Sequence, residues 1–83
     1  MKVIIYSKSH CPLCDEAKAL VSLFQGDYPI ELQERDIHAH DGWLEKYQLE
    51  IPVIEVDGKQ LNCEQISYEN LEKLFSQTHV EDE

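Results

Sequence analysis

Cys11 and Cys14 are the residues of this chain best suited to chemistry. They stand in the tetrapeptide Cys-Pro-Leu-Cys, directly after the apolar stretch 3–6 and at the start of an amphipathic segment. A thiol in the first turn of a helix meets free backbone N–H groups and the positive end of the helix dipole, and both stabilise a thiolate. Because only the thiolate attacks a disulfide, the motif predicts a reactive site at sulfur.

The spacing of the two thiols predicts how they would divide the reaction. Residues at i and i+3 lie on one side of a helix, within reach of a disulfide bond. We expect Cys14, one turn further into the helix, to be the more buried thiol. Cys11 would then attack and Cys14 would resolve the mixed disulfide. Lys8 upstream favours a thiolate at Cys11, whereas Asp15 and Glu16 oppose it.

Two other interpretations of the pair remain open. The first is a binding module in which the cysteines hold zinc, or an iron–sulfur cluster shared across a dimer. Zinc normally takes four ligands, and only Cys63 and the four histidines could complete the set. The second is an interaction domain that catalyses weakly. From the residues alone we predict no metal site, and we expect Cys63 to be a small buried residue, as free cysteines usually are.

Length and charge limit the remaining functions. A chain of 83 residues holds one domain, which we place at 1–78 with an acidic tail at 79–83. A net charge of −10 repels phosphate backbones and anionic lipids, so we predict no nucleic-acid and no membrane binding. The apolar run near the N-terminus is shorter than the roughly 7–15 residues of a signal peptide. We therefore expect a cytoplasmic protein, and a monomer.

Hydrophobic periodicity and turn residues predict an α/β domain in the order β-α-β-α-β-β-α. The expected elements span residues 2–6, 11–25, 30–37, 42–48, 51–56, 59–63 and 68–78. Asp57-Gly58 predicts a tight hairpin, and Ser67 predicts a helix cap. The first and last helices should each bury one face, made of Leu13, Ala17, Leu20, Val21 and Phe24, and of Tyr68, Leu71, Leu74 and Phe75.

The alternation of the first three strands with helices predicts parallel pairing among them. The last two strands form an antiparallel hairpin. The result is a mixed four-stranded sheet with helices on both faces.

Residues 6–14, Tyr-Ser-Lys-Ser-His-Cys-Pro-Leu-Cys, resemble the active-site segment of dithiol glutaredoxins, where a tyrosine usually stands at the position of Leu13. Ile51-Pro52-Val53 resembles the cis-proline segment of that family, and Asp57-Gly58-Lys59 resembles its hairpin. The resemblance covers nearly the whole chain and is strongest to short, divergent bacterial glutaredoxin-like proteins. It implies the thioredoxin-like fold in its glutaredoxin-type form.

The resemblance also implies a substrate site. Pro52 would be cis, although X–Pro bonds are cis in only about 5–6% of cases, and would face the cysteine pair. The backbone of Ile51 would pair with the substrate as an added strand does. Lys8 would lie near a carboxylate of glutathione, and Pro12 and Leu13 would complete the substrate-binding set.

The implied activity is that of a thiol–disulfide oxidoreductase. It would reduce mixed disulfides of proteins or of glutathione, and its own disulfide would be reduced again by glutathione or by a reductase. The resemblance implies no bound cofactor, with glutathione as the reducing co-substrate.

One departure from the family concerns glutathione. Glutaredoxins usually carry Gly-Gly followed by Asp after the hairpin and hold the γ-glutamyl group with it, whereas this chain reads Leu-Asn-Cys-Glu-Gln at 61–65. Glycine lets a backbone approach a ligand closely, and Asn62-Cys63 does so less freely. The negative net charge also opposes an anion. We therefore predict dithiol chemistry and leave glutathione dependence open.

Overall fold

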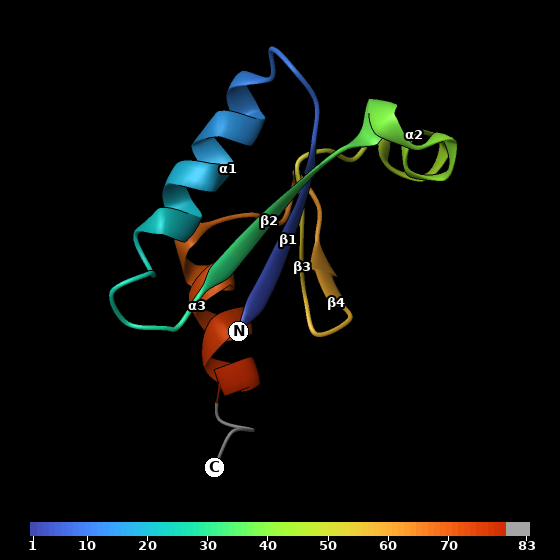
Figure 1. The fold of residues 1–83 in the computed structure, drawn as a ribbon. Coiled ribbons are helices and arrows are strands. Elements are labelled where there is room, and N and C mark those ends of the chain that lie inside the picture. Colours follow the sequence, from blue (N-terminus) through green and yellow to red (C-terminus); the bar gives the residue numbers. More distant parts are fainter. Residues whose placement is uncertain (80–83) are drawn as a thin grey trace.

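The elements follow one another in the predicted order (Figure 1). The structure is a computed structural model and describes residues 1–79. Its elements are β1 (Lys2–Ser7), α1 (Pro12–Ser22), β2 (Glu31–Asp36), a 3-10 helix (Ile37–Ala39), α2 (Asp41–Tyr47), β3 (Val53–Val56), β4 (Lys59–Leu61) and α3 (Tyr68–His79). Residues 80–83 of the predicted acidic tail lie outside the described residues. Within 1–79, none of the helices has the length and apolar character needed to cross a membrane.

The four strands form one mixed sheet in the order β2-β1-β3-β4. β1 runs parallel to β2, but β3 runs antiparallel to both β1 and β4. The prediction that the first three strands are all parallel is therefore wrong at β3. The reason is the position of α2, which lies beyond the end of the sheet where β2 finishes (Figure 1). The chain re-enters the sheet at that same end and must run back beside β1.

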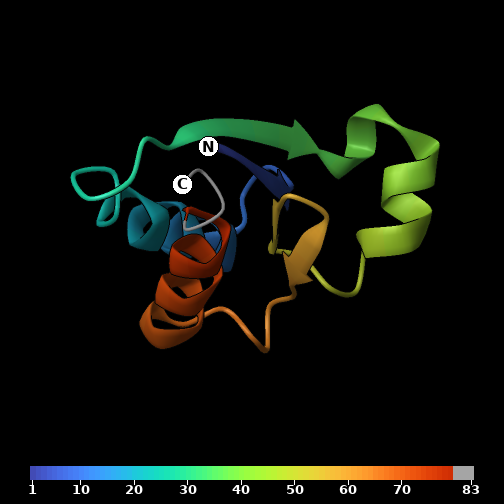
Figure 2. The same cartoon turned by 90° about the horizontal axis from the view of Figure 1, so that it is seen from below.

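One face of the sheet carries the main hydrophobic core. Val3 and Ile5 of β1 lie opposite Val56 and Ile54 of β3, and all four are buried. Helices α1 and α3 cover this face together, on the opposite side of the sheet from α2 (Figure 2). They contribute Ala17, Val21, Leu71, Leu74 and Phe75 to the core. The predicted burial of these residues is confirmed.

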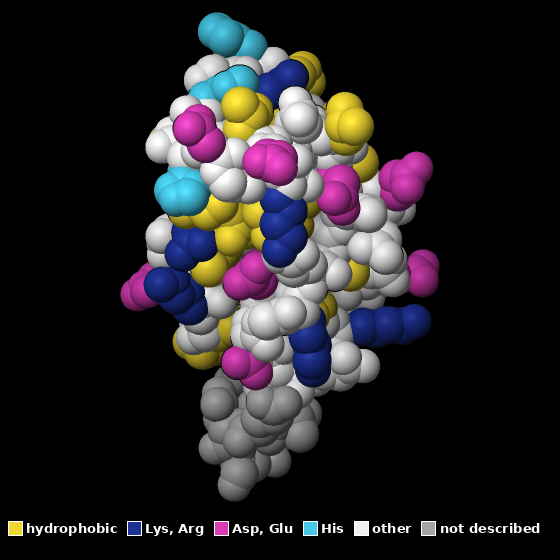
Figure 3. All heavy atoms as spheres, turned by 90° about the vertical axis from the view of Figure 1, so that its right-hand side faces the viewer, with side chains coloured by type: hydrophobic (Ala, Val, Ile, Leu, Met, Phe, Trp, Pro, Cys, Tyr) yellow, Lys and Arg dark blue, Asp and Glu magenta, His cyan; other side chains and the backbone are white. Residues whose placement is uncertain are grey.

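The other face is covered by α2 only near the end where β1 leaves the sheet. The rings of Tyr6 and Tyr47 stack with centroids 4.2 Å apart, and Val53 packs beside them. Arg35 donates to the Tyr6 hydroxyl at 3.0 Å. Burial raises the pKa of Tyr6, the charge of Glu55 adds to this effect, and the Arg35 hydrogen bond opposes it. Figure 3, viewed from the α2 and β4 side, shows apolar side chains exposed between basic ones. The cluster of Tyr6, Tyr47 and Val53 holds the start of β3 against β1.

Two residues predicted to be buried are exposed instead. Leu13 is 59% exposed and Tyr68 is 48% exposed. Both lie in the first turn of their helices. Helical periodicity shows which side of a helix faces the core, but it does not show where along the helix the core ends.

The predicted hairpin and helix cap are present in the structure, but several helices and strands begin or end at other residues than predicted. Asp57 and Gly58 both have positive φ, of 53° and 82°, as a two-residue hairpin of this kind requires. Ser67 Oγ accepts the Asn70 N–H at 3.1 Å and confirms the predicted cap. The predicted second strand, 30–37, ends at Asp36, and Ile37–Ala39 form the 3-10 helix, after which His40 Nδ1 accepts the Gly42 N–H. The first helix and β4 end earlier than predicted.

Candidate active site

A sharp turn at His10 places Cys11 at the start of α1. The φ of His10 is 57°, in the left-handed region that residues other than glycine seldom adopt. Cys11 then returns to an extended conformation and becomes the N-cap of the helix, with Pro12 as the first helical residue. Pro12 fits there because that position needs no N–H donor. The predicted helix start at the motif is therefore confirmed.

The sulfur of Cys11 performs the capping. The Cys14 N–H donates to Cys11 Sγ at 3.1 Å, and the Asp15 N–H donates to the Cys11 carbonyl at 3.1 Å. In the reduced protein the same donor and the helix dipole favour negative charge on this sulfur. The N-terminal end of α1 thus suits a thiolate at Cys11.

The two cysteines form a disulfide in the structure, with Cα atoms 5.2 Å apart, which is within the ordinary range. Cys11 is 8% exposed and Cys14 is 1% exposed. The predicted order of burial is confirmed. An incoming sulfur therefore has better access to Cys11.

A small cavity beside the motif, which we call the Pro52 groove, brings together residues far apart in the sequence. Its volume is about 110 Å³. The Ile51–Pro52 peptide bond is cis, as the resemblance implied, and Pro52 lines the groove opposite α1. The lining residues are Leu13, Glu16, Ala17, Leu20, Pro52, Cys63 and Ile66. Leu13 and Pro52 of the predicted substrate-binding set therefore share one cavity.

Lys8 belongs to a different cavity, which we call the Lys8 cavity. It has a volume of about 460 Å³ and is lined by Ser7, Lys8, Ser9, His10, Asp15, Lys18, Glu34 and Asp36. Lys18 Nζ lies 2.9 Å from Glu34 and 3.5 Å from Asp15, and Ser7 Oγ donates to Glu34 at 2.9 Å. The Lys18 and Ser7 hydrogen bonds lower the pKa of Glu34, and the Glu34 hydrogen bond raises the pKa of Lys18. The predicted substrate-binding residues are thus divided between two cavities.

Ile51 and Pro12 also lie outside the lining of the Pro52 groove. Pro12 is exposed at the first turn of α1. Ile51 packs, half-buried, against the cluster that contains Tyr6 and Tyr47, and its N–H donates to the Tyr47 carbonyl at 3.1 Å. Strand-like pairing of a substrate at this position would have to use other backbone groups.

The segment 62–66 closes on itself, which the sequence did not predict. The N–H groups of Gln65 and Ile66 both donate to the Asn62 carbonyl. The Glu64 N–H donates to Asn62 Oδ1, and the Asn62 N–H donates to Gln65 Oε1. The Cys63 N–H donates to the Glu50 carbonyl at 3.0 Å. Asn62 was the available signal, because asparagine side chains often bond to nearby backbone in turns.

Cys63 is half-buried with a free thiol, rather than fully buried as predicted. It reaches the Pro52 groove because the segment 62–66 folds beside Pro52. Among residues 1–79, no three His, Cys, Asp or Glu side chains are grouped closely enough to hold a metal ion. A ligand set of Cys11, Cys14 and Cys63 within one chain therefore receives no support.

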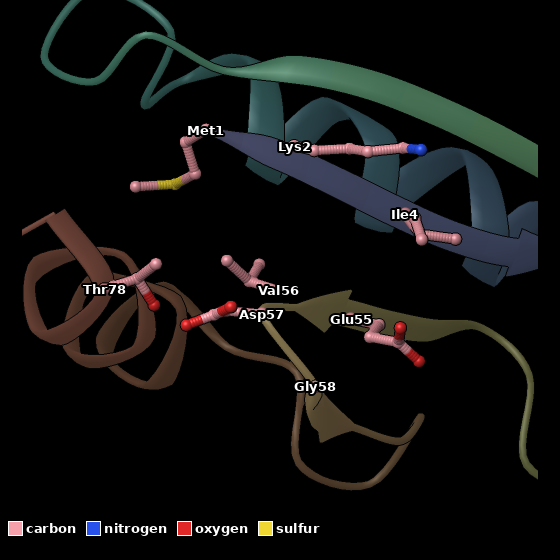
Figure 4. A pocket seen from close by; sticks show the side chains of 8 residues that line it. All are labelled: Met1, Lys2, Ile4, Glu55, Val56, Asp57, Gly58 and Thr78. Atoms are coloured by element: carbon pink, nitrogen blue, oxygen red, sulfur yellow. The ribbon is translucent and has the colours of Figure 1, made fainter.

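A further cavity of about 560 Å³ lies at the other end of β1 from the cysteine pair (Figure 4). It is lined by the first residues of the chain, by the β3–β4 hairpin and by Thr78 of α3. In Figure 4 the Asp57 carboxylate points toward Thr78, while Lys2 extends away along β1. None of the described residues that line this cavity is a cysteine, and the thiol chemistry predicted from the sequence lies at the opposite end of the strand.

Comparison with known proteins agrees with this geometry. The family described as Glutaredoxin-like domain (DUF836) matches residues 2–76. Glutaredoxin-C4 of Arabidopsis thaliana is 37% identical over 68 residues, which cover 72% of this chain and 47% of that protein. Glutaredoxin-C8 of Oryza sativa subsp. japonica is 36% identical over 69 residues, which cover 71% of this chain and 48% of that protein. The chain spans about half the length of these curated relatives.

Two solved structures share the fold at low sequence identity. A structural-genomics target protein from X. campestris superposes with a TM-score of 0.75 at 19% identity, over 89% of this chain and 95% of that one. A structure described as a malarial protein gives a TM-score of 0.62 at 15% identity, over 93% and 94% of the two chains. The α/β thioredoxin-like fold is thus shown by structure, and the match over residues 2–76 shows that the chain belongs to the glutaredoxin-like family.

Proposed function

We propose that this protein is a dithiol thiol–disulfide oxidoreductase that reduces mixed disulfides of proteins or of glutathione. The observation that supports this most strongly is the position of Cys11. Its sulfur caps α1, accepts the Cys14 N–H and is more exposed than its disulfide partner. Such a sulfur forms a stabilised thiolate when reduced. It also has a second thiol within bonding distance to complete the exchange.

The proposed reaction is two successive thiol–disulfide exchanges. The Cys11 thiolate attacks one sulfur of the substrate disulfide, whose S–S bond breaks as the mixed disulfide forms. The first substrate thiolate leaves and takes up a proton. Cys14, as its thiolate, then attacks Cys11 Sγ, the mixed disulfide breaks, and the second substrate thiolate leaves and is protonated. The substrate gains two electrons and two protons, and the protein ends with the Cys11–Cys14 disulfide.

A reductant must complete the cycle. Either two molecules of a monothiol such as glutathione or one dithiol of a reductase can supply the two electrons, and a disulfide of that reductant is the product. Both are available in the cytoplasm, which is where we propose that the protein acts, as a monomer. The net charge of −10 fits protein partners better than nucleic acids or anionic membranes.

The test compares three forms of the protein with a small disulfide substrate and excess dithiol reductant. Wild type and Cys63→Ser should turn over the substrate at similar rates, and Cys11→Ser should fall to the rate without protein. Mass spectrometry of the oxidised wild type should find the Cys11–Cys14 bond. Equal turnover by wild type and Cys11→Ser would rule out the proposed function. A bound metal that protects Cys11 and Cys14 from alkylation would favour the binding-module interpretation instead.

A further inference from the structure

The described residues that line the Pro52 groove carry no positive charge, and this affects which disulfides the cysteine pair can accept. Glu16 is the only charged residue among them, and this side chain is exposed. Apart from the thiol of Cys63, the other lining residues are apolar. Glutathione carries two carboxylates and a single ammonium group, so it is an anion at neutral pH. A groove whose only charge is a carboxylate opposes such a ligand and favours a cation.

Backbone donors do not replace the missing positive charge. All five N–H groups of the segment 62–66, which folds beside the groove, donate to acceptors within the protein. A ligand carboxylate would have to displace one of these bonds, of which those made by the Asn62 and Glu64 N–H groups are exposed to solvent. The segment that would hold the γ-glutamyl group in a glutaredoxin therefore offers an anion no backbone N–H that is not already bonded.

The nearby lysines are not placed to compensate. Lys8 and Lys18 line the Lys8 cavity rather than the Pro52 groove. Lys18 is held there by Glu34 and Asp15. The overall charge of −10 adds a long-range repulsion for anions. The charge of Glu16 at the groove and the net charge of the whole chain thus both favour a cationic ligand over an anionic one.

The size of the groove identifies the kind of molecule. Its volume of about 110 Å³ is well below the roughly 300–1,000 Å³ typical of pockets that enclose small molecules. It can take about one amino-acid side chain while the rest of the ligand lies across the surface. Leu13, within the motif, offers an apolar contact there because it is 59% exposed. An extended polypeptide fits this arrangement.

We propose that the Pro52 groove favours polypeptide disulfides that carry Lys or Arg next to the reacting cysteine over glutathione disulfide. Glu16 is the specificity-determining residue. This inference rests on the proposed oxidoreductase function. The reaction is the same exchange: Cys11 and Cys14 give two electrons to the peptide disulfide, the two departing peptide thiolates take up protons from solvent, and the protein is left with the Cys11–Cys14 disulfide.

The experiment uses three symmetrical disulfides, in which both sulfurs are equivalent. Two are dimers of one short peptide with Arg or with Glu beside its cysteine, and the third is glutathione disulfide. The pre-reduced protein is mixed with each, quenched by alkylation and weighed by mass spectrometry. Each rate is divided by that of 2-mercaptoethanol with the same disulfide. We expect the Arg peptide to react about tenfold faster than the other two at low salt, with a smaller ratio at high salt.

Charge variants make the test specific to the groove. Glu16→Gln should reduce the preference for Arg over Glu by about threefold, and Glu16→Lys should remove or reverse it. Glu72→Lys is the matched control, because Glu72 is an exposed carboxylate on α3 outside the groove lining and changes the net charge equally. A preference that changes equally at both positions, or glutathione disulfide reacting as fast as the Arg peptide, would overturn this inference alone. If no disulfide reacts faster with wild type than with Cys11→Ser, both this inference and the proposed function are wrong.

Discussion

The cavities on the two sides of the Cys-Pro-Leu-Cys motif differ in how their charges are satisfied. The Lys8 cavity is lined by both cationic and anionic groups, and Glu34 accepts hydrogen bonds from both Lys18 and Ser7. In the Pro52 groove, apolar side chains surround a small space and a single carboxylate stands at its border. The larger cavity has most of its charge neutralised internally. The smaller one presents apolar side chains and one exposed carboxylate, and Leu13 of the motif is part of its lining.

This difference separates a structural role from a recognition role. Ion pairs that are complete within the protein stabilise the position of α1 on β2, and they leave little attraction for a ligand. An exposed leucine, a cis-proline and an unpaired carboxylate offer contacts that a substrate could complete. The following predictions test the assignment of recognition to the Pro52 groove.

The largest effect should come from Cys14→Ser, which removes the resolving thiol between the two cavities. The mixed disulfide on Cys11 should then accumulate, and release of the second substrate thiol should slow by a factor on the order of 10² or more, because an intramolecular attack has a high effective concentration. Trapping by mass spectrometry checks this. Rapid release from Cys14→Ser would mean that another thiol resolves the intermediate, and the double variant with Cys63→Ser would identify it.

Leu13→Ala should weaken the binding of a polypeptide substrate at the Pro52 groove without changing the charge of the protein. Burial of a leucine side chain contributes about 1.5–3 kcal/mol, and roughly half of that remains to be gained when a substrate covers Leu13. We therefore expect kcat/KM for a polypeptide disulfide to fall about fivefold, mainly through KM. Leu23→Ala is the matched control, because Leu23 is also exposed, at 63%, just after the other end of α1. Equal losses at both positions would argue against recognition by the groove.

Glu34→Gln should destabilise the fold slightly and leave substrate preference unchanged. The pair with Lys18 is partly exposed and screened by solvent, so its loss should cost about 0.2–1 kcal/mol of unfolding free energy. The pKa of Glu34 is lowered from its ordinary value of 4.5 in the folded state. The stabilisation is therefore complete above 4.5 and is lost as the pH falls through the lowered folded pKa.

Denaturant unfolding of Glu34→Gln and wild type at several pH values measures this difference. It should be constant near neutral pH and should shrink in acid. Glu31→Gln, at an exposed position on the same strand, serves as the control for the loss of one carboxylate. A change in the preference for Arg over Glu peptides in Glu34→Gln would contradict the structural role given to the Lys8 cavity.

Lys8→Ala should have the smallest effect. Lys8 is exposed and lines the cavity away from Pro52, and an exposed charge contributes less than about 1 kcal/mol. We expect kcat/KM for the Arg peptide disulfide to change by less than about twofold. A large loss confined to glutathione disulfide would instead restore the role that the family resemblance implies for Lys8.

The residues that the sequence assigned correctly are those whose local chemistry determines their structure. Pro12 at the first helical position, Asp57-Gly58 in the hairpin and Ser67 as a cap each depend on the backbone of their immediate neighbours. The direction of β3 depends on where α2 packs, and the exposure of Leu13 depends on where the core ends. The packing position of α2 and the limit of the core both depend on contacts between distant segments, so a local sequence pattern does not predict them.

The site shows the same division. The start of α1 at Cys11 and the greater burial of Cys14 follow from the motif, whereas the cis state of Pro52 followed only from the family resemblance. Lys8 and Pro52 line separate cavities, which neither the motif nor the resemblance predicted. The closed hydrogen bonding of the segment 62–66 required the Asn62 and Gln65 side chains to meet their own backbone.

The placement of β1 has a consequence for slow motions of the molecule. This strand is hydrogen-bonded on both sides, to β2 and to β3, and its residues from Val3 to Ser7 are buried. Amides in such a strand exchange with solvent deuterium only when the whole domain opens. The loop that holds Cys11 begins where this strand ends. Cys11 and Cys14 are therefore oxidised and reduced next to the end of β1, the strand whose backbone amide protons should exchange most slowly.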